Sequence, residues 1–235
     1  MNDSMACALL DEQKLDEQKN ELKESAIACS HFQRINVLDN VERAVVLAFY
    51  AQLFARMILT AYQNTNLASL IILPSEALVV LLIIFRRRTD TLSLRWQDWM
   101  AALCATVLPT FVISTGTQPA LSNGLFAAFL GLIGFIVQIH GKICLGRSFG
   151  LVAANRGIKS SGPYRFVRHP IYAGYLFGHV AFLIMFPAPW NICVLGVALL
   201  LQLYRIHVEE NVLSLDPLYV EYQKHVRYRM IPGLF

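Results

Sequence analysis

Apolar residues gather into long blocks that follow a polar N-terminal stretch. A block at 171–204 is too long for one ordinary helix, and Pro187, Pro189 and Asn191 interrupt it with strong turn chemistry. It therefore predicts a tight helical hairpin. Each arm is slightly shorter than the roughly 20 residues that a full membrane span needs, so complete crossing stays open. Four further blocks precede the hairpin, at 45–62, 67–85, 99–114 and 125–144.

Residues 1–40 form a polar segment without such a block. The segment contains a short repeat, LDEQK at 10–14 and again at 15–19. Its few apolar residues make no clean helical stripe, which predicts a solvated, frayed helix or a flexible tail. It also lacks the basic start and apolar core of a cleavable signal peptide.

The composition indicates an integral membrane protein. Of 235 residues, 56% are hydrophobic and only 15% are charged, whereas a soluble domain carries about 25% charged residues. The net charge of +4 serves membrane topology rather than nucleic-acid binding, because no basic run is interleaved with aromatic residues. We therefore expect an all-α membrane protein with about six transmembrane helices.

The loop charges agree with six membrane segments. The loops at 86–95 and 142–168 and the tail after the hairpin are basic, whereas those at 63–66, 115–123 and 187–191 carry no charge. Six segments put every basic loop on one side of the membrane, and an odd number would mix the two sets. The positive-inside rule then places both termini in the cytosol, and the compact size favours a bacterial inner membrane.

Two charged residues lie inside the first apolar blocks. Arg56 and Glu76 either pair across neighbouring helices or reach the interface from nearer the segment ends. Neither is a catalytic candidate. The five cysteines are scattered without a CxxC pair, so we expect neither a metal site nor a disulfide framework.

Most of the polar chemistry follows residue 145. A turn-rich loop leads into the sequence RFVRHPIYAG at 165–174. Because the residue before a proline avoids helical geometry, His169 is expected at the N-terminal edge of the first hairpin arm. Free N–H groups and the positive helix dipole there suit an anionic group, such as a cofactor carboxylate. The alternative is a solvated interfacial histidine.

The second arm of the hairpin carries a matching pair of charges. Arg205 and Glu209 are four residues apart, so a helix puts both on one face. A hairpin returns this end to the start of the first arm, close to Tyr164, His169 and Tyr172. The expected result is a pocket lined by cations and a carboxylate, unless Arg205 and Glu209 form only an ordinary ion pair.

These motifs together resemble the isoprenylcysteine carboxyl methyltransferase family and its bacterial relatives. The resemblance lies in GPYRFVRHPIYAGY at 162–175, the hairpin, R-x3-EExxL at 205–213 and YVEY at 219–222, and it covers residues 146–235. It implies a membrane enzyme that uses S-adenosylmethionine, with a cytosolic cofactor pocket. The domain organisation becomes a polar tail at 1–40, four helices within 41–145 and a catalytic region at 146–235.

The resemblance also implies roles for individual residues. Arg205 and Glu209 would be catalytic, with Arg205 on the substrate. The segment 156–159 matches the family by position rather than by identity. The implied cofactor-binding residues are Arg156, Gly157, Ile158, Lys159, Tyr164, His169, Pro170, Ile171, Tyr172 and Glu209.

Methyl transfer from a sulfonium to a carboxylate is a direct displacement that needs positioning in a water-poor pocket. Glu209 would hold the cofactor ammonium, His169 and the adjacent helix N-terminus its carboxylate, and Arg205 the carboxylate of the acceptor. The expected acceptor is a hydrophobic or lipid-tailed small molecule or peptide that enters from the membrane lipids. No nucleic-acid partner and no metal are expected.

Three alternatives stay open. Sterol reductases, which use NADPH, carry a similar RHPxYxG stretch and end in a pattern like YRMIP at 228–232. A phospholipid N-methyltransferase would keep the cofactor and change the acceptor to an amine. A non-catalytic accessory membrane protein would retain the pocket without turnover.

Overall fold

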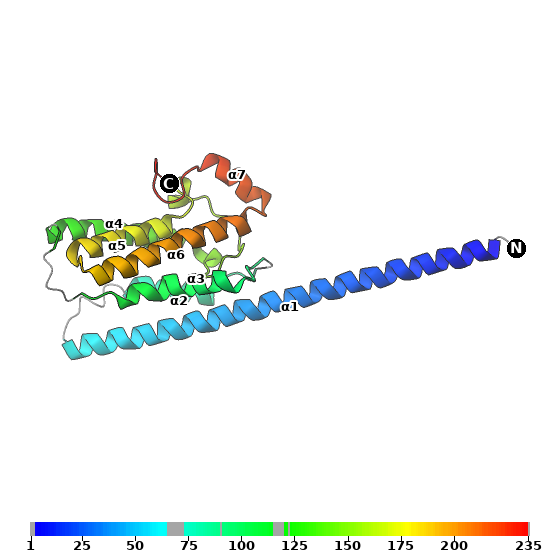
Figure 1. Cartoon of the computed structure of the whole chain (residues 1–235), viewed down its shortest axis with the longest axis horizontal. Helices are drawn as coiled ribbons and strands as arrows, with labels where there is room; N and C mark the ends of the chain where they lie inside the picture. The colour runs from blue at the N-terminus through cyan, green and yellow to red at the C-terminus, as the bar shows by residue number, and fades with distance from the viewer. Residues whose placement is uncertain (1–2, 65–72, 90, 115–119, 122, 235) are drawn as a thin grey trace.

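The chain forms a bundle of helices with one projecting arm (Figure 1), seen in a computed structural model that describes residues 3–64, 73–89, 91–114, 120–121 and 123–234. Each predicted apolar block contains a helix, although residues 67–72 of the second block lie outside the described part. Among the described residues, three short 3-10 turns and one isolated bridge between Leu92 and Ala154 lie between the helices. The helices are α1 (Asp3–Asn64), α2 (Leu73–Ile84), α3 (Trp96–Val107), α4 (Gly124–Leu145), α5 (Pro170–Met185), α6 (Pro189–Leu213) and α7 (Pro217–His225).

The predicted helical hairpin is present as α5 and α6. Asn191 fixes its turn, because this fully buried amide donates to the carbonyls of Ile113 and Phe186 and accepts from the Ile113 N–H, each at 2.9 Å. The two arms differ in length, with 16 residues in α5 and 25 in α6. The prediction that both arms are short is therefore wrong for α6, which continues to Leu213.

Close glycine contacts fix how α5 lies on α4. A Cβ atom at Gly134 would meet the Gly174 carbonyl oxygen at 2.7 Å, and one at Gly174 would meet the Gly134 carbonyl oxygen at 2.6 Å. Small residues of this kind let two helix backbones approach closely where lipid offers no hydrophobic drive for association. The pairing holds the start of α5 beside α4.

Helix α1 passes through the expected tail boundary at residue 40 without a break. Its N-terminal half projects beyond the bundle, and its second half packs along α2 (Figure 1). Ile35, Asp39 and Glu42 are buried against the bundle. The contact of α1 with the body therefore begins before residue 40.

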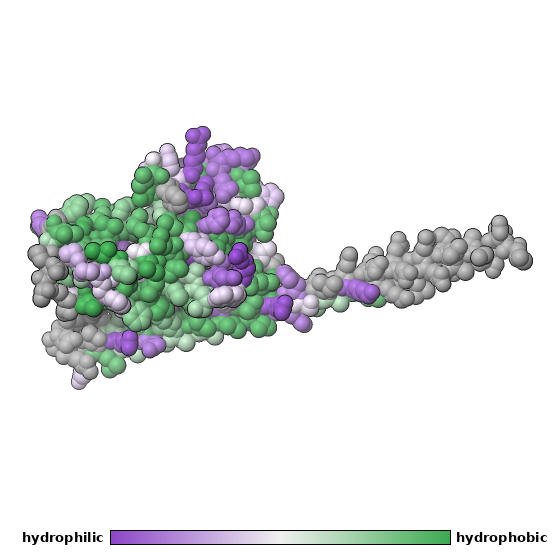
Figure 2. Space-filling view, in the orientation of Figure 1, coloured by the Kyte–Doolittle hydropathy of each residue, from purple (hydrophilic) through white to green (hydrophobic). Residues whose placement is uncertain are grey.

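The face of the bundle seen in Figure 2 is largely apolar, with polar residues gathered toward the end that carries α7. On α4 the side chains of Leu125, Phe129, Leu132 and Ile136 are all exposed, and such a contiguous apolar surface marks a membrane or protein contact. In the part of the chain that the structure describes, two helices are long and apolar enough to cross a membrane, at Gly124–Ser148 and Pro189–Leu213. These observations indicate a membrane protein, while the expected count of six spans stays a prediction.

Replacing Gly174 with alanine tests the helix contact. The added methyl group would meet the backbone of α4, which cannot give way as a side chain can, so the free energy of unfolding should fall by about 1–3 kcal/mol. Gly178→Ala is the matched control, because a Cβ there has nothing within 4 Å. Thermal unfolding in detergent would measure both variants, and equal effects would contradict this packing.

Candidate active site

The candidate site is a cavity of about 720 Å³ lined by residues of α1 to α7 and of the loop before α5. Pro170 is buried at the start of α5, where it lies against Gly141 of α4 instead of lining the cavity. All other predicted site residues line this one space, namely Arg156, Gly157, Ile158, Lys159, Tyr164, His169, Ile171, Tyr172, Arg205 and Glu209.

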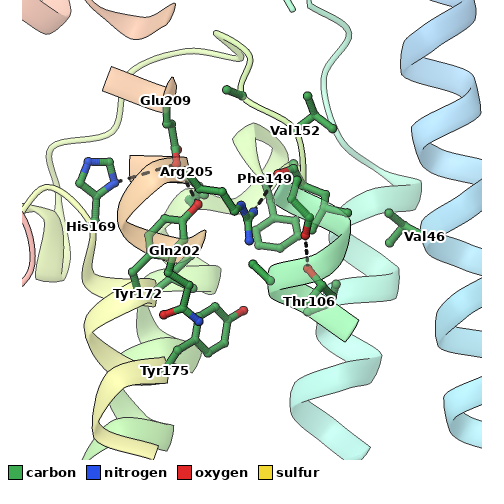
Figure 3. Close-up of a pocket in the computed structure, with 18 of the residues that line it drawn as sticks. Val46, Thr106, Phe149, Val152, His169, Tyr172, Tyr175, Gln202, Arg205 and Glu209 are labelled. Carbon is green, nitrogen blue, oxygen red and sulfur yellow. Dashed lines mark hydrogen bonds and ion pairs between the residues drawn. The ribbon is translucent and has the colours of Figure 1, made fainter. Parts of the chain in front are cut away.

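Tyr172 joins the two charged residues of the second hairpin arm (Figure 3). Its hydroxyl donates to Glu209 Oε2 at 3.1 Å, and the Arg205 guanidinium lies 5.3 Å from the centre of its ring. Each charge thus contacts a different part of one side chain, so the alternative of an ordinary Arg205–Glu209 ion pair is not the arrangement seen. The hairpin brings the two arms together as predicted.

Glu210 anchors the chain around the site. Its carboxylate accepts from Arg168 Nε at 2.8 Å and from Arg229 Nε at 2.9 Å, and it lies 3.2 Å from His169 Nε2. The backbone adds two bonds, because Arg168 and His169 donate their N–H groups to the carbonyls of Tyr228 and Arg229. The C-terminal segment thereby closes over the RHP motif.

The two adjacent glutamates consequently differ in what they can do. Glu210 is enclosed by three basic side chains, whereas the Glu209 side chain is 31% exposed and faces the cavity. A carboxylate with open coordination can receive a positively charged ligand group. Sequence reasoning assigned a role to Glu209 but to neither Glu210 nor Arg229. The signal for Glu210 was a second acid on the hairpin arm that returns to the cations of the RHP motif.

The His169 ring lies between both glutamates. Its Nδ1 atom is 4.0 Å from Glu209 Oε2, while Nε2 faces Glu210. Two carboxylates already lie beside this ring, and their charge disfavours a third anion there. The His169 ring therefore serves to orient the two glutamates. Anion binding at this end would fall to N–H groups in the first turn of α5, because the first turn of a helix leaves such donors without an intrahelical acceptor.

Two neutral tyrosines close the neighbouring wall. Burial, together with the negative charge of Glu209, raises the pKa of Tyr164 well above its ordinary value. Burial likewise raises the pKa of Tyr222 to about 12, and its hydroxyl donates to the Tyr164 carbonyl at 2.6 Å. Both phenols stay protonated near neutral pH and shape the cavity without adding charge.

A buried cluster of four charges stands behind the opposite wall. Arg86 contacts Asp39 and Glu42, each at 2.9 Å, and Arg156 contacts them at 2.9 and 3.2 Å. The Arg156 guanidinium is thus occupied by acids of α1, so this residue would meet a cofactor through its backbone. A Cβ at Gly150 would meet the Arg156 guanidinium, so a larger residue there would displace it from the two acids.

This cluster connects α1 to Arg205 through one short loop. Glu42 Oε1 accepts the N–H groups of Leu151 at 2.7 Å and Val152 at 3.1 Å. The Leu151 carbonyl in turn accepts from Arg205 Nη2 at 2.8 Å. Sequence reasoning missed Asp39 and Glu42, although the loop at 142–168, which has no acid of its own, called for acidic partners elsewhere.

The comparison with protein families agrees with this geometry. Residues 127–215 match the isoprenylcysteine carboxyl methyltransferase (ICMT) family. We call this matched stretch the ICMT-family region. It runs from α4 through the hairpin to the end of α6, and so contains Arg205, Glu209 and the RHP motif. No curated protein matches the chain.

The match confirms the predicted family resemblance and supports a membrane methyltransferase. It includes Glu210, whereas α1 with Asp39 and Glu42, and the closing segment with Arg229, lie outside it. The ICMT-family region therefore depends on charged partners from both ends of the chain.

The charge cluster predicts how stability varies with pH. Burial alone would raise the pKa of Asp39, but its hydrogen bond with Arg156 and the charges of Arg86, Arg156 and Arg43 hold it below the ordinary 3.8. A carboxyl with a lowered pKa in the folded state stabilises the fold fully above its ordinary pKa, and this contribution is lost as pH falls through the lowered value.

Asp39→Asn should therefore lower the unfolding temperature equally at pH 7 and pH 5. Its difference from the unaltered protein should shrink only below about pH 3.8. Glu221→Gln, on an exposed pair with Lys224, serves as a control with little effect. A difference that already vanishes at pH 6 would contradict the cluster.

Proposed function

We propose that the protein is an S-adenosylmethionine-dependent membrane methyltransferase that esterifies the carboxylate of a lipid-linked or hydrophobic acceptor. The observation that carries this proposal is the joint contact of Arg205 and Glu209 with Tyr172 inside one cavity of the ICMT-family region. A carboxylate and a guanidinium at this spacing suit two ligands of opposite charge. The basic loops support a pocket at the cytosolic face, with both termini on that side.

The residues of the cavity fit the cofactor. Glu209 would hold its ammonium group, and the N–H groups at the start of α5 would hold its carboxylate. Gly157, with φ of +100°, gives the 156–159 loop a backbone turn that side chains rarely allow, so its peptide groups can line the cavity closely. The chemistry that the cofactor supplies when bound is an activated methyl group on a sulfonium.

Arg205 is prepared to orient an acceptor carboxylate. The Leu151 carbonyl and the Tyr172 ring hold the guanidinium from two sides. In the described part of the chain, the Arg205 side chain makes one hydrogen bond, through Nη2. The other N–H donors of its guanidinium are therefore left for a carboxylate. Holding the acceptor oxygen in a cavity shielded from water lowers the entropic cost of the reaction and removes a competing nucleophile.

The acceptor carboxylate is already an anion, so the residues around it need not remove a proton. Tyr164 and Tyr172 surround the site with uncharged phenols, while the His169 ring is engaged by Glu209 and Glu210. This arrangement favours positioning over general base catalysis. It supports a carboxylate acceptor over the amine of a phospholipid.

Glu209→Ala should weaken cofactor binding at least tenfold, because the mutation removes the open carboxylate expected to meet the ammonium group. Calorimetry on detergent-solubilised protein would titrate S-adenosylmethionine, S-adenosylhomocysteine and NADPH in parallel. The expected result is saturable binding of the first two only. Glu221→Ala, on the exposed face of α7, is the matched control.

Unchanged S-adenosylmethionine binding in Glu209→Ala would contradict the role of Glu209. Binding of NADPH alone would instead favour a membrane reductase. Loss of cofactor binding in both variants would point to damaged protein, which a thermal unfolding curve on each sample detects.

A further inference from the structure

A second polar group lines the cavity away from Glu209 and Arg205. It consists of Tyr50 of α1, Glu76 of α2, Tyr175 and His179 of α5 and Gln202 of α6, which we call the deep polar group. Figure 3 shows Gln202 and Tyr175 beyond Tyr172, on the side away from His169 and Glu209. With a helical rise of 1.5 Å per residue, Gln202 lies about 5 Å along α6 from Arg205, and His179 about 10 Å along α5 from Tyr172.

Two members of the deep polar group lack hydrogen-bond partners among the described residues. Gln202 is only 3% exposed, yet its Oε1 atom is unpaired, and the same holds for Nδ1 of His179. Buried polar atoms in native proteins are nearly always paired, so unpaired atoms that line a cavity indicate a ligand or bound water. Polar side chains among apolar helices of a membrane protein are themselves costly and usually functional.

Glu76 belongs to this group instead of pairing with Arg56. Its carboxyl group faces the Tyr50 hydroxyl, and Tyr50 packs in the same cluster as Tyr175. Arg56 is exposed on α1. Four helices therefore direct hydrogen-bonding groups into one part of the cavity.

The nearby charges favour a neutral ligand group over a cation. Lys142 of α4 is buried, with its Nζ atom 3.0 Å from Ser75 Oγ and 5.7 Å from the centre of the Tyr175 ring. This ammonium group, bonded to the residue before Glu76, disfavours a second positive charge nearby. The Gln202 amide offers both a donor and an acceptor, which matches a hydroxyl or an amide.

We infer that the deep polar group is a subsite for a neutral hydrogen-bonding group, a hydroxyl or amide, carried partway along the tail of the acceptor. This inference rests on the proposed function, because Arg205 sets the position of the carboxylate. Leu53, Met57 and Val79 line the same cavity and would cover the hydrocarbon on either side. The acceptor is then a functionalised long-chain acid, whose polar group lies about 5–10 Å from its carboxylate.

The test compares stearate with 2-, 7- and 12-hydroxystearate, bound to the full-length protein in detergent with and without S-adenosylmethionine. The mid-chain 7-hydroxy acid should bind at least tenfold more tightly than stearate. Gln202→Leu should reduce this preference to less than twofold while leaving cofactor affinity unchanged. Gln97→Leu, on the exposed face of α3, should keep the preference.

Equal binding of all four acids, or a preference that survives in Gln202→Leu, would overturn the subsite. Glu76→Gln is a second variant, should Gln202→Leu fold poorly, and an unchanged preference in it has the same meaning. A failure of the proposed function is separable, because it appears as absent cofactor binding while the acid preference is still measured without cofactor.

Discussion

The site depends most on a buried cluster of two acids and two arginines, namely Asp39, Glu42, Arg86 and Arg156. Moving such groups out of water costs several kcal/mol per ion, and only close, well-bonded partners recover that cost. Each arginine contacts both acids, and Glu42 also accepts two peptide N–H groups. Through Glu42 the cluster also holds the Leu151 loop, whose carbonyl accepts from Arg205.

The helical hairpin supplies the second constraint on the cavity. Its turn is set by Asn191, and the close approach of α5 to α4 is set by Gly134 and Gly174. These contacts are far from the chemistry, yet they determine where Tyr172 meets Arg205 and Glu209. Glu210 then ties this end of the hairpin to the C-terminal segment through Arg168 and Arg229. A largely apolar cavity, with Arg205 and Glu209 in one part and the deep polar group in another, follows from these contacts.

The sequence was informative where local chemistry decides structure. Hydropathy located the helices, the interruption at 187–191 located the hairpin turn, and the spacing of Arg205 and Glu209 placed both on one face. The family resemblance followed from the same motifs and is confirmed over the matched stretch. These features depend on residues close together in the chain or on a connection of known geometry.

The remaining features depend on distant partners, which a single sequence does not reveal. Whether an acid near the N-terminus is solvated or buried depends on where Arg86 and Arg156 lie, so Asp39 was assigned to a tail and Glu42 was given no role. The same reason hid the different roles of Glu209 and Glu210, since Arg229 decides which one is enclosed. The role of Glu76 and Gln202 likewise becomes apparent only in the fold, where four helices bring their polar side chains to one cavity.

An experimental structure with S-adenosylhomocysteine bound would test the central claim most directly. The predicted result is a ligand inside the cavity, with its amino group on Glu209, its carboxylate at the first turn of α5, and Arg205 still bonded to the Leu151 carbonyl. A ligand bound outside the cavity, or an Arg205 drawn away to the cofactor carboxylate, would contradict the proposed division between cofactor and acceptor.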